Sequence, residues 1–308
     1  MASLIELITQ LREATGCGMM KCKEALVANN NDYEAAVDWL RKKGLSTAAK
    51  KSERVTTEGL VAVNIDNNKA SIIEVNSETD FVARNEKFQD FVVKVSKAAL
   101  NVANSDNYVE DLKAQVIDGK KIGDELVDKI ATIGENLQIR RGKTITLNGN
   151  GAIVSYVHSA IAPNLGKIAV LLALKSDANK EKLNELGKQI CMHIAASKPE
   201  FISREDVPAD RLQREKDICA EQSKASGKPA NIIEKMVEGR IRKFYEEICL
   251  LEQSFIMDPD KKVSEIIKSF EKENNCKVEV QEYELYVLGS GLQKKEENFA
   301  EEVASMTK

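Results

Sequence analysis

The chain has 308 residues, of which 43% are hydrophobic and 31% are charged, and its formal net charge is −4. That length is enough for roughly two domains, each with a sizeable core. Because basic and acidic residues are interleaved and the balance is slightly acidic, the composition argues against a broad basic surface, and no direct nucleic-acid partner is expected.

The first segment with a helical pattern, residues 4–43, predicts three short helices. Asn31 followed by Glu34 is typical of a capping box at the start of the third helix. Gly44 is expected to end that helix. Residues 1–57 are therefore predicted to form a small three-helix module and a polar linker after Gly44, on which the module can rock.

The next segment, residues 58–150, changes from a helical to an alternating pattern. The strands and the helix expected here are residues 60–66, 69–75, 85–103 and 137–147. Asn67 and Asn68 predict a hairpin turn between the first two strands. A polar, helical stretch is expected up to Gly134. These elements predict a first α+β subdomain.

The same order of elements, a pair of strands followed by a helix, recurs in the second half of the chain. The expected strands and helix are residues 151–158, 167–174 and 180–196. A longer connection, residues 159–166, joins the two strands. Residues 276–288 alternate and are predicted to complete this sheet. A second α+β subdomain is therefore expected from residues 151–202 and 252–290.

Two long helical patterns separate the parts of this second subdomain. They predict a protruding helical hairpin over residues 203–251, with helices at 203–226 and 229–251. Asp258 and Pro259 are expected to open a further helix that runs to Phe270. An amphipathic helix at 296–306 is expected within a C-terminal module, residues 291–308. The fold class predicted for the whole chain is α+β.

The sequence lacks the motifs of common catalytic sites. It contains no GxxxxGK[ST] loop, no GxSxG, no HExxH and no dinucleotide fingerprint. Of its two histidines, His193 lies in an apolar helical pattern and is expected to be packed or to cap. His158 ends a strand, and both a surface role and a partner contact are open for it. No catalytic residue, metal site or cofactor is therefore expected.

The cysteines and the chain start indicate the compartment. Six cysteines are scattered without a CxxC pair, which favours reduced thiols over a zinc or redox site. No stretch reaches the roughly 18 apolar residues of a membrane span. The N-terminus has neither a signal h-region nor an arginine-rich transit peptide. A cytoplasmic protein without a membrane partner is expected.

One polar corner, in the segment EVNSETDFVARNEKF at residues 74–88, contains an isolated aromatic residue. Residues 78–83 are expected to form one short turn that points Phe81 outward. Two interpretations stay open. Phe81 can pack beneath Phe88, which spacing alone favours, or it can be exposed as an anchor for a pocket in a partner.

Four segments, in the same order along the chain, resemble the elongation factor Ts family. They are LREATGCGMMKCKEAL at 11–26, EVNSETDFVAR at 74–84, MHIAASKPEFI at 192–202 and SGKPANIIEKMVEGRIRKF at 226–244. The resemblance implies a ubiquitin-associated-like (UBA-like) three-helix module, two α+β core subdomains with small antiparallel sheets, a protruding helical hairpin and a C-terminal helical module. It also implies a guanine-nucleotide exchange factor for elongation factor Tu, without catalytic chemistry or a cofactor of its own.

The resemblance further implies which residues contact the partner. They are Thr79, Asp80, Phe81 and Val82 at the corner, and Arg12, Met19, Met20 and His158 elsewhere. The corner is similar to the segment that enters the G domain of GDP-bound or nucleotide-free elongation factor Tu and disturbs its Mg²⁺ site. The hairpin is a candidate dimerisation surface; the alternatives are that it docks only on the partner or does little in a one-to-one complex.

Two features depart from the family pattern. Lys21 stands where the family often has an acidic residue, and the connection 159–166 is longer than in some members. The residues themselves also leave a competing hypothesis open, a pure interaction scaffold. In that case the three-helix module binds a ubiquitin-like or other helical surface and the hairpin dimerises. A hydrolase is a distant third, because the chain has no phosphate loop.

Overall fold

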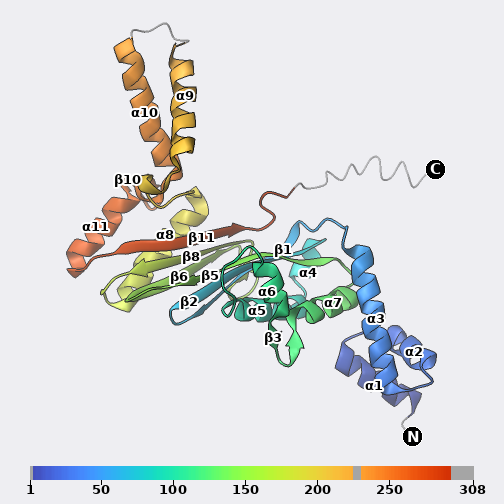
Figure 1. Cartoon of the computed structure of the whole chain (residues 1–308). Helices are drawn as coiled ribbons and strands as arrows, with labels where there is room; N and C mark the ends of the chain where they lie inside the picture. The colour runs from blue at the N-terminus through green and yellow to red at the C-terminus, as the bar shows by residue number, and fades with distance from the viewer. Residues whose placement is uncertain (1–2, 225–229, 293–308) are drawn as a thin grey trace.

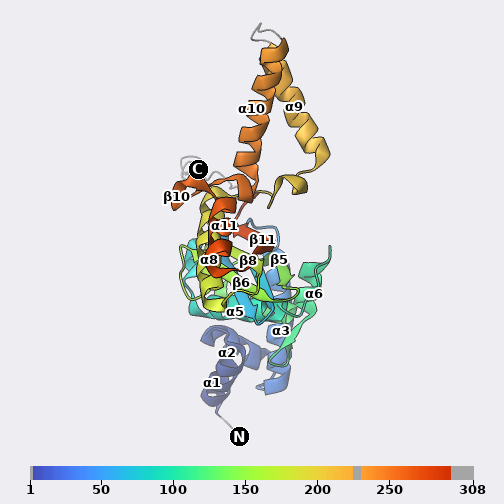
Figure 2. The same ribbon diagram turned by 90° about the vertical axis from the view of Figure 1, so that its left-hand side faces the viewer.

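The structure is a computed structural model that describes residues 3–224 and 230–292. These residues form three parts along one long axis: an N-terminal group of three helices, an α+β core, and a helical hairpin that projects from the opposite end of the core (Figures 1 and 2). This architecture agrees with the predicted α+β class. The helix expected at 296–306 lies outside the described residues, as does the expected hairpin turn at 227–229.

The three predicted N-terminal helices are present as α1 (Leu4–Thr15), α2 (Met19–Ala28) and α3 (Tyr33–Lys51). Ser3 caps α1, because its hydroxyl accepts the Glu6 N–H at 3.3 Å while the Glu6 carboxylate accepts the Ser3 N–H at 2.7 Å. The three helices enclose a small core of Ile8, Leu11, Cys22, Ala25, Leu26, Ala36 and Leu40.

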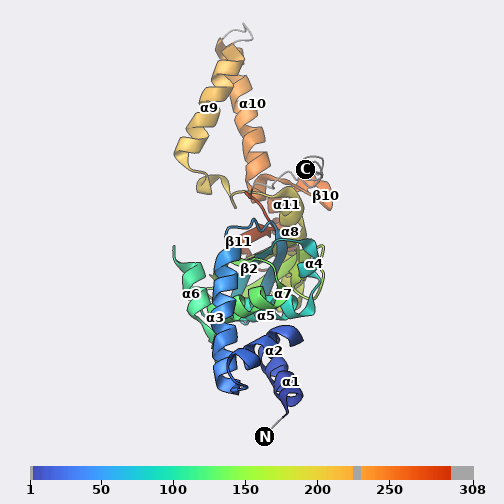
Figure 3. The same ribbon diagram turned by 90° about the vertical axis from the view of Figure 1, so that its right-hand side faces the viewer.

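The third helix differs from the prediction at both ends. Its cap is Asp32, whose carboxylate accepts the Ala35 N–H at 2.9 Å, and Asn31 instead lies in a left-handed turn with φ 64°. The helix also continues through Gly44 to Lys51, so the predicted end at Gly44 is wrong. The first part of the expected linker is therefore helical, and α3 runs from the module along the core (Figure 3).

The first sheet contains the predicted hairpin. Its strands are β1 (Glu58–Asp66), β2 (Lys69–Ser77), β5 (Leu137–Thr146) and the short β7 (Leu165–Gly166). Their order is β5-β2-β1-β7, and all neighbours are antiparallel. Asn67 turns the hairpin with φ 51°. The expected strands at 60–66, 69–75 and 137–147 are confirmed.

The second sheet is formed by β6 (Gly151–His158), β8 (Ile168–Lys175) and β11 (Glu279–Val287), in the order β11-β8-β6. All its neighbours are antiparallel. The prediction that residues 276–288 complete this sheet is confirmed.

The two sheets pack face to face and each carries helices on its outer face. Alternate residues of β1 separate accordingly: Leu60 and Ala62 face the helices, whereas Val61 and Val63 face the second sheet. On the first sheet lie α4 (Asp80–Ala83), α5 (Glu86–Ala99), α6 (Tyr108–Ala114) and α7 (Ile122–Ile133). On the second lie α8 (Lys180–Ser197) and α11 (Val263–Asn274).

A buried carboxylate on β2 joins the first sheet to the segment that follows β11 of the second sheet. The side chain of Glu74 is fully buried and its oxygens accept bonds from Arg140 at 2.8 Å, Arg141 at 2.6 Å and the Gly289 N–H at 2.8 Å. Burial alone raises the pKa of this carboxyl, but the bonds from Gly289 and the two arginines outweigh burial and hold the pKa below its usual value. The ionised form therefore fastens the two sheets together.

The helical hairpin consists of α9 (Ala209–Lys224) and α10 (Ala230–Ile248). Its base is held by an apolar cluster of Val207, Ile248, Cys249, Phe201, Leu212, Phe244 and Tyr245. Ion pairs join this base to its surroundings: Lys262 lies 3.2 Å from Glu246 and 3.0 Å from Glu252, and Arg204 lies 2.7 Å from Glu252. The hairpin thus leaves the core from a braced base.

Three sequence predictions about local structure hold only in part, because the predicted helices are present as α5, α11, α6 and α7 but with other bounds or interruptions. Asp258 and Pro259 do not open a helix but belong to β10 (Asp258–Lys262), which pairs with β9 (Ser254–Phe255). The helix predicted at 85–103 ends at Ala99. The polar stretch before Gly134 contains a small hairpin, β3 (Val116–Ile117) and β4 (Lys120–Lys121), between its helices.

Candidate functional site

Phe81 lies on a short helix that leaves the first sheet. β2 ends at Ser77, and α4 begins after Thr79, whose backbone is extended with φ −123°. Val82 and Ala83 face inward and are 5% and 2% exposed, within the core between the first sheet and its helices. The Phe81 side chain points the other way and is 80% exposed. The alternative in which Phe81 packs beneath Phe88 is therefore wrong.

The corner around Phe81 is fastened to the loop that follows α7. The Thr79 N–H and hydroxyl donate to the two oxygens of Glu135 at 2.9 Å and 2.6 Å. One residue earlier, Glu78 accepts the Asn136 N–H at 2.5 Å and lies 3.4 Å from Arg54. The sequence pattern does not single out this loop, which lies at the end of the stretch predicted to be polar and helical.

Asp80 contributes a free carboxylate beside Phe81. It is exposed at the first position of α4, and among the described residues no hydrogen bond or ion pair holds its side chain. The charge is therefore available to a group outside the chain. Within residues 3–224 and 230–292, His, Cys, Asp and Glu nowhere gather in a set of three or more fit to hold a metal ion.

His158 is placed at an edge, as expected, and the connection after it contributes to the core of the first sheet. The His158 side chain is exposed at the end of β6, with Nδ1 3.0 Å from the Tyr156 hydroxyl. In the connection 159–166, Ala162 and Leu165 pack in the same core as Val82. Strand β7, at the end of this connection, pairs with β1. The structure thus brings this connection into the same apolar core that holds Val82.

The N-terminal candidate residues lie apart from the corner. Met19 and Met20 start α2 and are 57% and 75% exposed, and Arg12 is exposed in the last turn of α1. In the described part of the chain, no hydrogen bond or ion pair connects these three side chains to residues 79–82. All three side chains are exposed on the three-helix module.

The three-helix module docks on α7 of the core. Gly44 of α3 lies against this helix, since a Cβ at Gly44 would be 3.6 Å from the Ala131 Cβ. Lys21 donates to the Ala131 carbonyl at 2.8 Å, and Arg41 pairs with Asp124 at 3.1 Å. The departure at Lys21 therefore has a structural consequence: its ammonium joins the module to the C-terminal end of α7, where cations are favoured.

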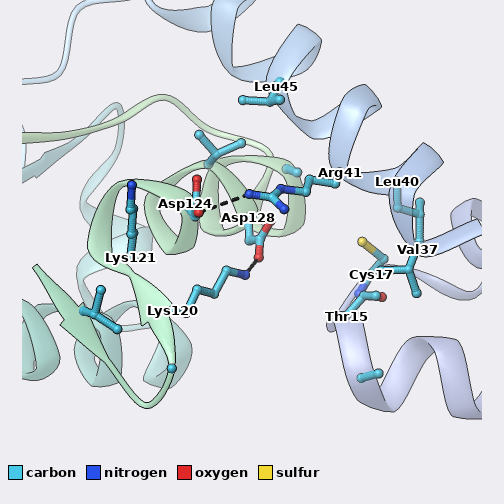
Figure 4. Close-up of a pocket in the computed structure, with 15 residues that line it drawn as sticks. Thr15, Cys17, Val37, Leu40, Arg41, Leu45, Lys120, Lys121, Asp124 and Asp128 are labelled. Carbon is cyan, nitrogen blue, oxygen red and sulfur yellow. Dashed lines mark hydrogen bonds and ion pairs between the residues drawn. The ribbon is translucent and has the colours of Figure 1, made fainter. Parts of the chain in front are cut away.

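A groove of about 630 Å³ remains between the module and α7. Figure 4 shows Arg41 reaching across it to Asp124, and Lys120 of β4 paired with Asp128 on the core side. Burial lowers the pKa of Lys120, while neighbouring acidic residues oppose that effect. The lining mixes both signs of charge and shows no set of groups arranged for catalysis.

The second histidine and the buried thiols have structural roles. His193 is fully buried, with Nε2 2.9 Å from the Gln253 Oε1 and Nδ1 accepting the Ile256 N–H at 3.2 Å. Burial raises the pKa of the Cys191 thiol, and raises that of Cys249 to about 11. Neither thiol is therefore an activated nucleophile. The expectation that His193 is packed is confirmed. None of the helices in the described ranges is long and apolar enough to cross a bilayer.

Comparison with known proteins finds similar sequences over nearly the whole chain. The family model described as Elongation factor TS matches residues 78–290, and a model described as UBA-like domain matches residues 3–44. Elongation factor Ts from Rhodospirillum centenum is 49% identical over 302 residues, which cover 97% of both chains. Elongation factor Ts from Rhizobium etli strain CIAT 652 is 48% identical over 304 residues, covering 98% of this chain and 97% of the relative. That from Rickettsia felis is 46% identical over 301 residues, covering 97% and 96%.

Proposed function

The chain belongs to the elongation factor Ts family, whose members are nucleotide exchange factors rather than enzymes, and we propose that it releases GDP from elongation factor Tu. The proposed partner is elongation factor Tu in its GDP-bound and nucleotide-free forms. The observation that carries the proposal is the exposure of Phe81, 80%, on a helix whose next residue, Val82, is only 5% exposed.

The proposed mechanism acts on the Mg²⁺ site of the partner's G domain. Such a domain holds GDP through phosphate-loop amides and a Mg²⁺ ion that bridges protein and phosphate oxygens. The Asp80–Phe81 corner inserts near this ion and displaces groups that support it. Because the phosphates then lose their largest local counter-charge, GDP is held less tightly. This mechanism requires only contacts between the two proteins. The chain needs no catalytic acid, base or cofactor of its own.

The size of the effect requires more than one residue. Reducing GDP affinity about a thousandfold takes about 4 kcal/mol of differential contact. Burying one Phe side chain contributes about 1.5–3 kcal/mol. The exposed Arg12, Met19 and Met20 of the module and the exposed His158 are therefore proposed as further contacts of the same partner.

A catalytic exchange assay tests this function against the scaffold hypothesis. Elongation factor Tu loaded with fluorescent GDP is mixed with excess unlabelled nucleotide and a substoichiometric amount of the chain. An exchange factor releases all the labelled GDP over many turnovers. A scaffold leaves the release rate unchanged, and that result contradicts the proposal.

The helical hairpin is proposed as a self-association surface. Ile218 on α9 and Ile232 on α10 are 41% and 42% exposed on helices that stand away from the core. Sedimentation equilibrium of the full chain and of Ile232→Glu tests this. A dimer that dissociates in the variant supports the proposal, and a monomeric parent chain contradicts it and leaves docking on the partner.

A further inference from the structure

Both carboxylate oxygens of Glu135 bind Thr79, the residue that precedes α4. Its Oε2 accepts the Thr79 N–H at 2.9 Å, and its Oε1 accepts the Thr79 hydroxyl at 2.6 Å. Thr79 occupies the N-cap position of α4, yet its side chain makes no capping bond to that helix. Both of its donors are instead committed to a carboxylate 56 residues away in the sequence.

The loop that carries Glu135 is itself held in place. Gly134 ends α7 in a left-handed conformation with φ 90°, which turns the chain towards the corner. Lys51 at the end of α3 donates to the Gly134 carbonyl. Asn136 is buried, and its side-chain amide donates to the Arg54 carbonyl at 2.8 Å. Glu135 therefore projects from a fixed position.

The corner needs such support because α4 has only four residues. A helix this short closes too few intrahelical bonds to be stable by itself. Val82 and Ala83 anchor its second half in the core, but the first half, with Asp80 and Phe81, is exposed. Hydrogen bonds to an ionised carboxylate are stronger than neutral ones, so Glu135 is well suited to fix the exposed half.

We propose that Glu135 is a positioning residue for nucleotide exchange. By binding both donors of Thr79, it holds the start of α4 so that Phe81 is presented in one orientation before the partner arrives. Presenting the side chain in its binding orientation lowers the entropy lost on binding. The inference rests on the proposed function of the Phe81 corner. It adds that Glu135, in the loop after α7, holds this corner in place.

Glu135→Ala and Glu135→Gln test the role, with Glu185→Ala on the opposite helix layer as the matched control, since Glu185 is exposed on α8. The measurements are the maximal GDP release rate at saturating factor and the factor concentration at half that rate. Glu135→Ala is expected to lower the maximal rate about tenfold, in line with the loss of charge-assisted hydrogen bonds. Glu135→Gln retains one acceptor oxygen and is expected to restore part of the rate. Glu185→Ala is expected to match the parent chain.

Two further measurements separate positioning from general damage. Amide hydrogen exchange over residues 79–82 is expected to speed up in Glu135→Ala, while the strands of the first sheet keep their protection. Thr79→Val removes the hydroxyl donor and leaves the carboxylate, and it is expected to reproduce part of the loss.

A double-variant comparison decides whether Glu135 acts through Phe81. In the Phe81→Ala background, Glu135→Ala is expected to cause little additional loss, because the side chain that it positions is gone. An equal loss in both backgrounds, or an unchanged maximal rate in Glu135→Ala alone, overturns the positioning role. If Phe81→Ala itself leaves release unchanged, the proposed role of the Phe81 corner fails, and if the parent chain does not speed release at all, the proposed function fails; both results differ from an equal loss in the two backgrounds.

Discussion

Phe81 and Val82 are adjacent in α4 but face opposite environments, since the Phe81 side chain is 80% exposed and that of Val82 is 5% exposed. A large aromatic residue in solvent does not contribute to folding by burial. The buried neighbour keeps the short helix on the core, and this arrangement directs the ring outward. Val82 therefore contributes to folding, while the neighbouring Phe81 remains free for the binding role proposed for it.

Replacing Phe81 by Ala is expected to slow GDP release by about tenfold or more, because the side chain proposed to enter the partner is removed. The free energy of unfolding is expected to change by less than about 0.5 kcal/mol, since the ring is exposed. Stopped-flow release of fluorescent GDP and urea unfolding measure the two effects.

Phe88→Ala is the control for the Phe81 variant, because the Phe88 side chain on α5 is fully buried in the core that also holds Val82. It is expected to lose about 3–5 kcal/mol of stability. Unchanged GDP release in Phe81→Ala would argue against a partner contact by this side chain.

Much of the fold was predictable because local pattern and burial agree. The alternation at Leu60–Val63 predicted a strand, and those residues do separate between two cores. Gly44 was misread as a helix end because sequence does not reveal that α7 lies against it, and close approach of two helices favours a small residue in mid-helix.

The site was only partly predictable. The short turn at Phe81 followed from local residue types, but its exposure depended on which neighbours the core takes up. The Thr79–Glu135 contact joins residues 56 positions apart and neither residue forms a motif by itself. Only the tertiary arrangement of β2 and the loop after α7 brings the two together.

Replacing Glu74 is expected to destabilise the junction of the two sheets. Glu74→Ala leaves Arg140 and Arg141 partly buried beside an empty site, which typically costs about 3–5 kcal/mol. The control is Glu279→Ala on β11, whose carboxylate is 67% exposed and 3.4 Å from Lys175. That surface pair is expected to contribute no more than about 0.5 kcal/mol. Urea unfolding of both variants tests the difference, and equal losses would contradict it.

Glu74 also predicts an acid limit to stability. Its folded-state pKa lies below the usual 4.5, so the unfolded chain binds a proton at a higher pH than the folded chain. The stabilisation is therefore present above about pH 4.5 and is lost as pH falls through the folded-state pKa. Thermal unfolding across this range should show a smaller acid-dependent loss in Glu74→Gln than in the parent chain.

His193 predicts a second, milder pH dependence. Burial lowers its pKa below the usual 6.5, although the bond to Gln253 partly opposes this. Between the lowered pKa and 6.5 the unfolded chain binds more protons, so stability is expected to fall as pH decreases below 6.5. The slope for one proton is at most about 1.4 kcal/mol per pH unit. His193→Gln should flatten this slope below pH 6.5, and an unchanged slope would mean that other groups cause the pH dependence.

Three glycines inside helices predict opposite effects of the same substitution. Gly239 in α10 has open space around it, and a Cβ at Gly44 would meet Ala131 at an ordinary 3.6 Å. Alanine at either position is expected to raise the free energy of unfolding by up to about 1 kcal/mol through helix propensity. A Cβ at Gly187 would lie 2.6 Å from the Val154 side chain, so alanine there is expected to cost about 1–3 kcal/mol by overpacking α8 on β6. Urea unfolding of the three variants tests the order, and a loss at Gly44 as large as that at Gly187 would mean that α3 and α7 are packed more tightly than the 3.6 Å approach indicates.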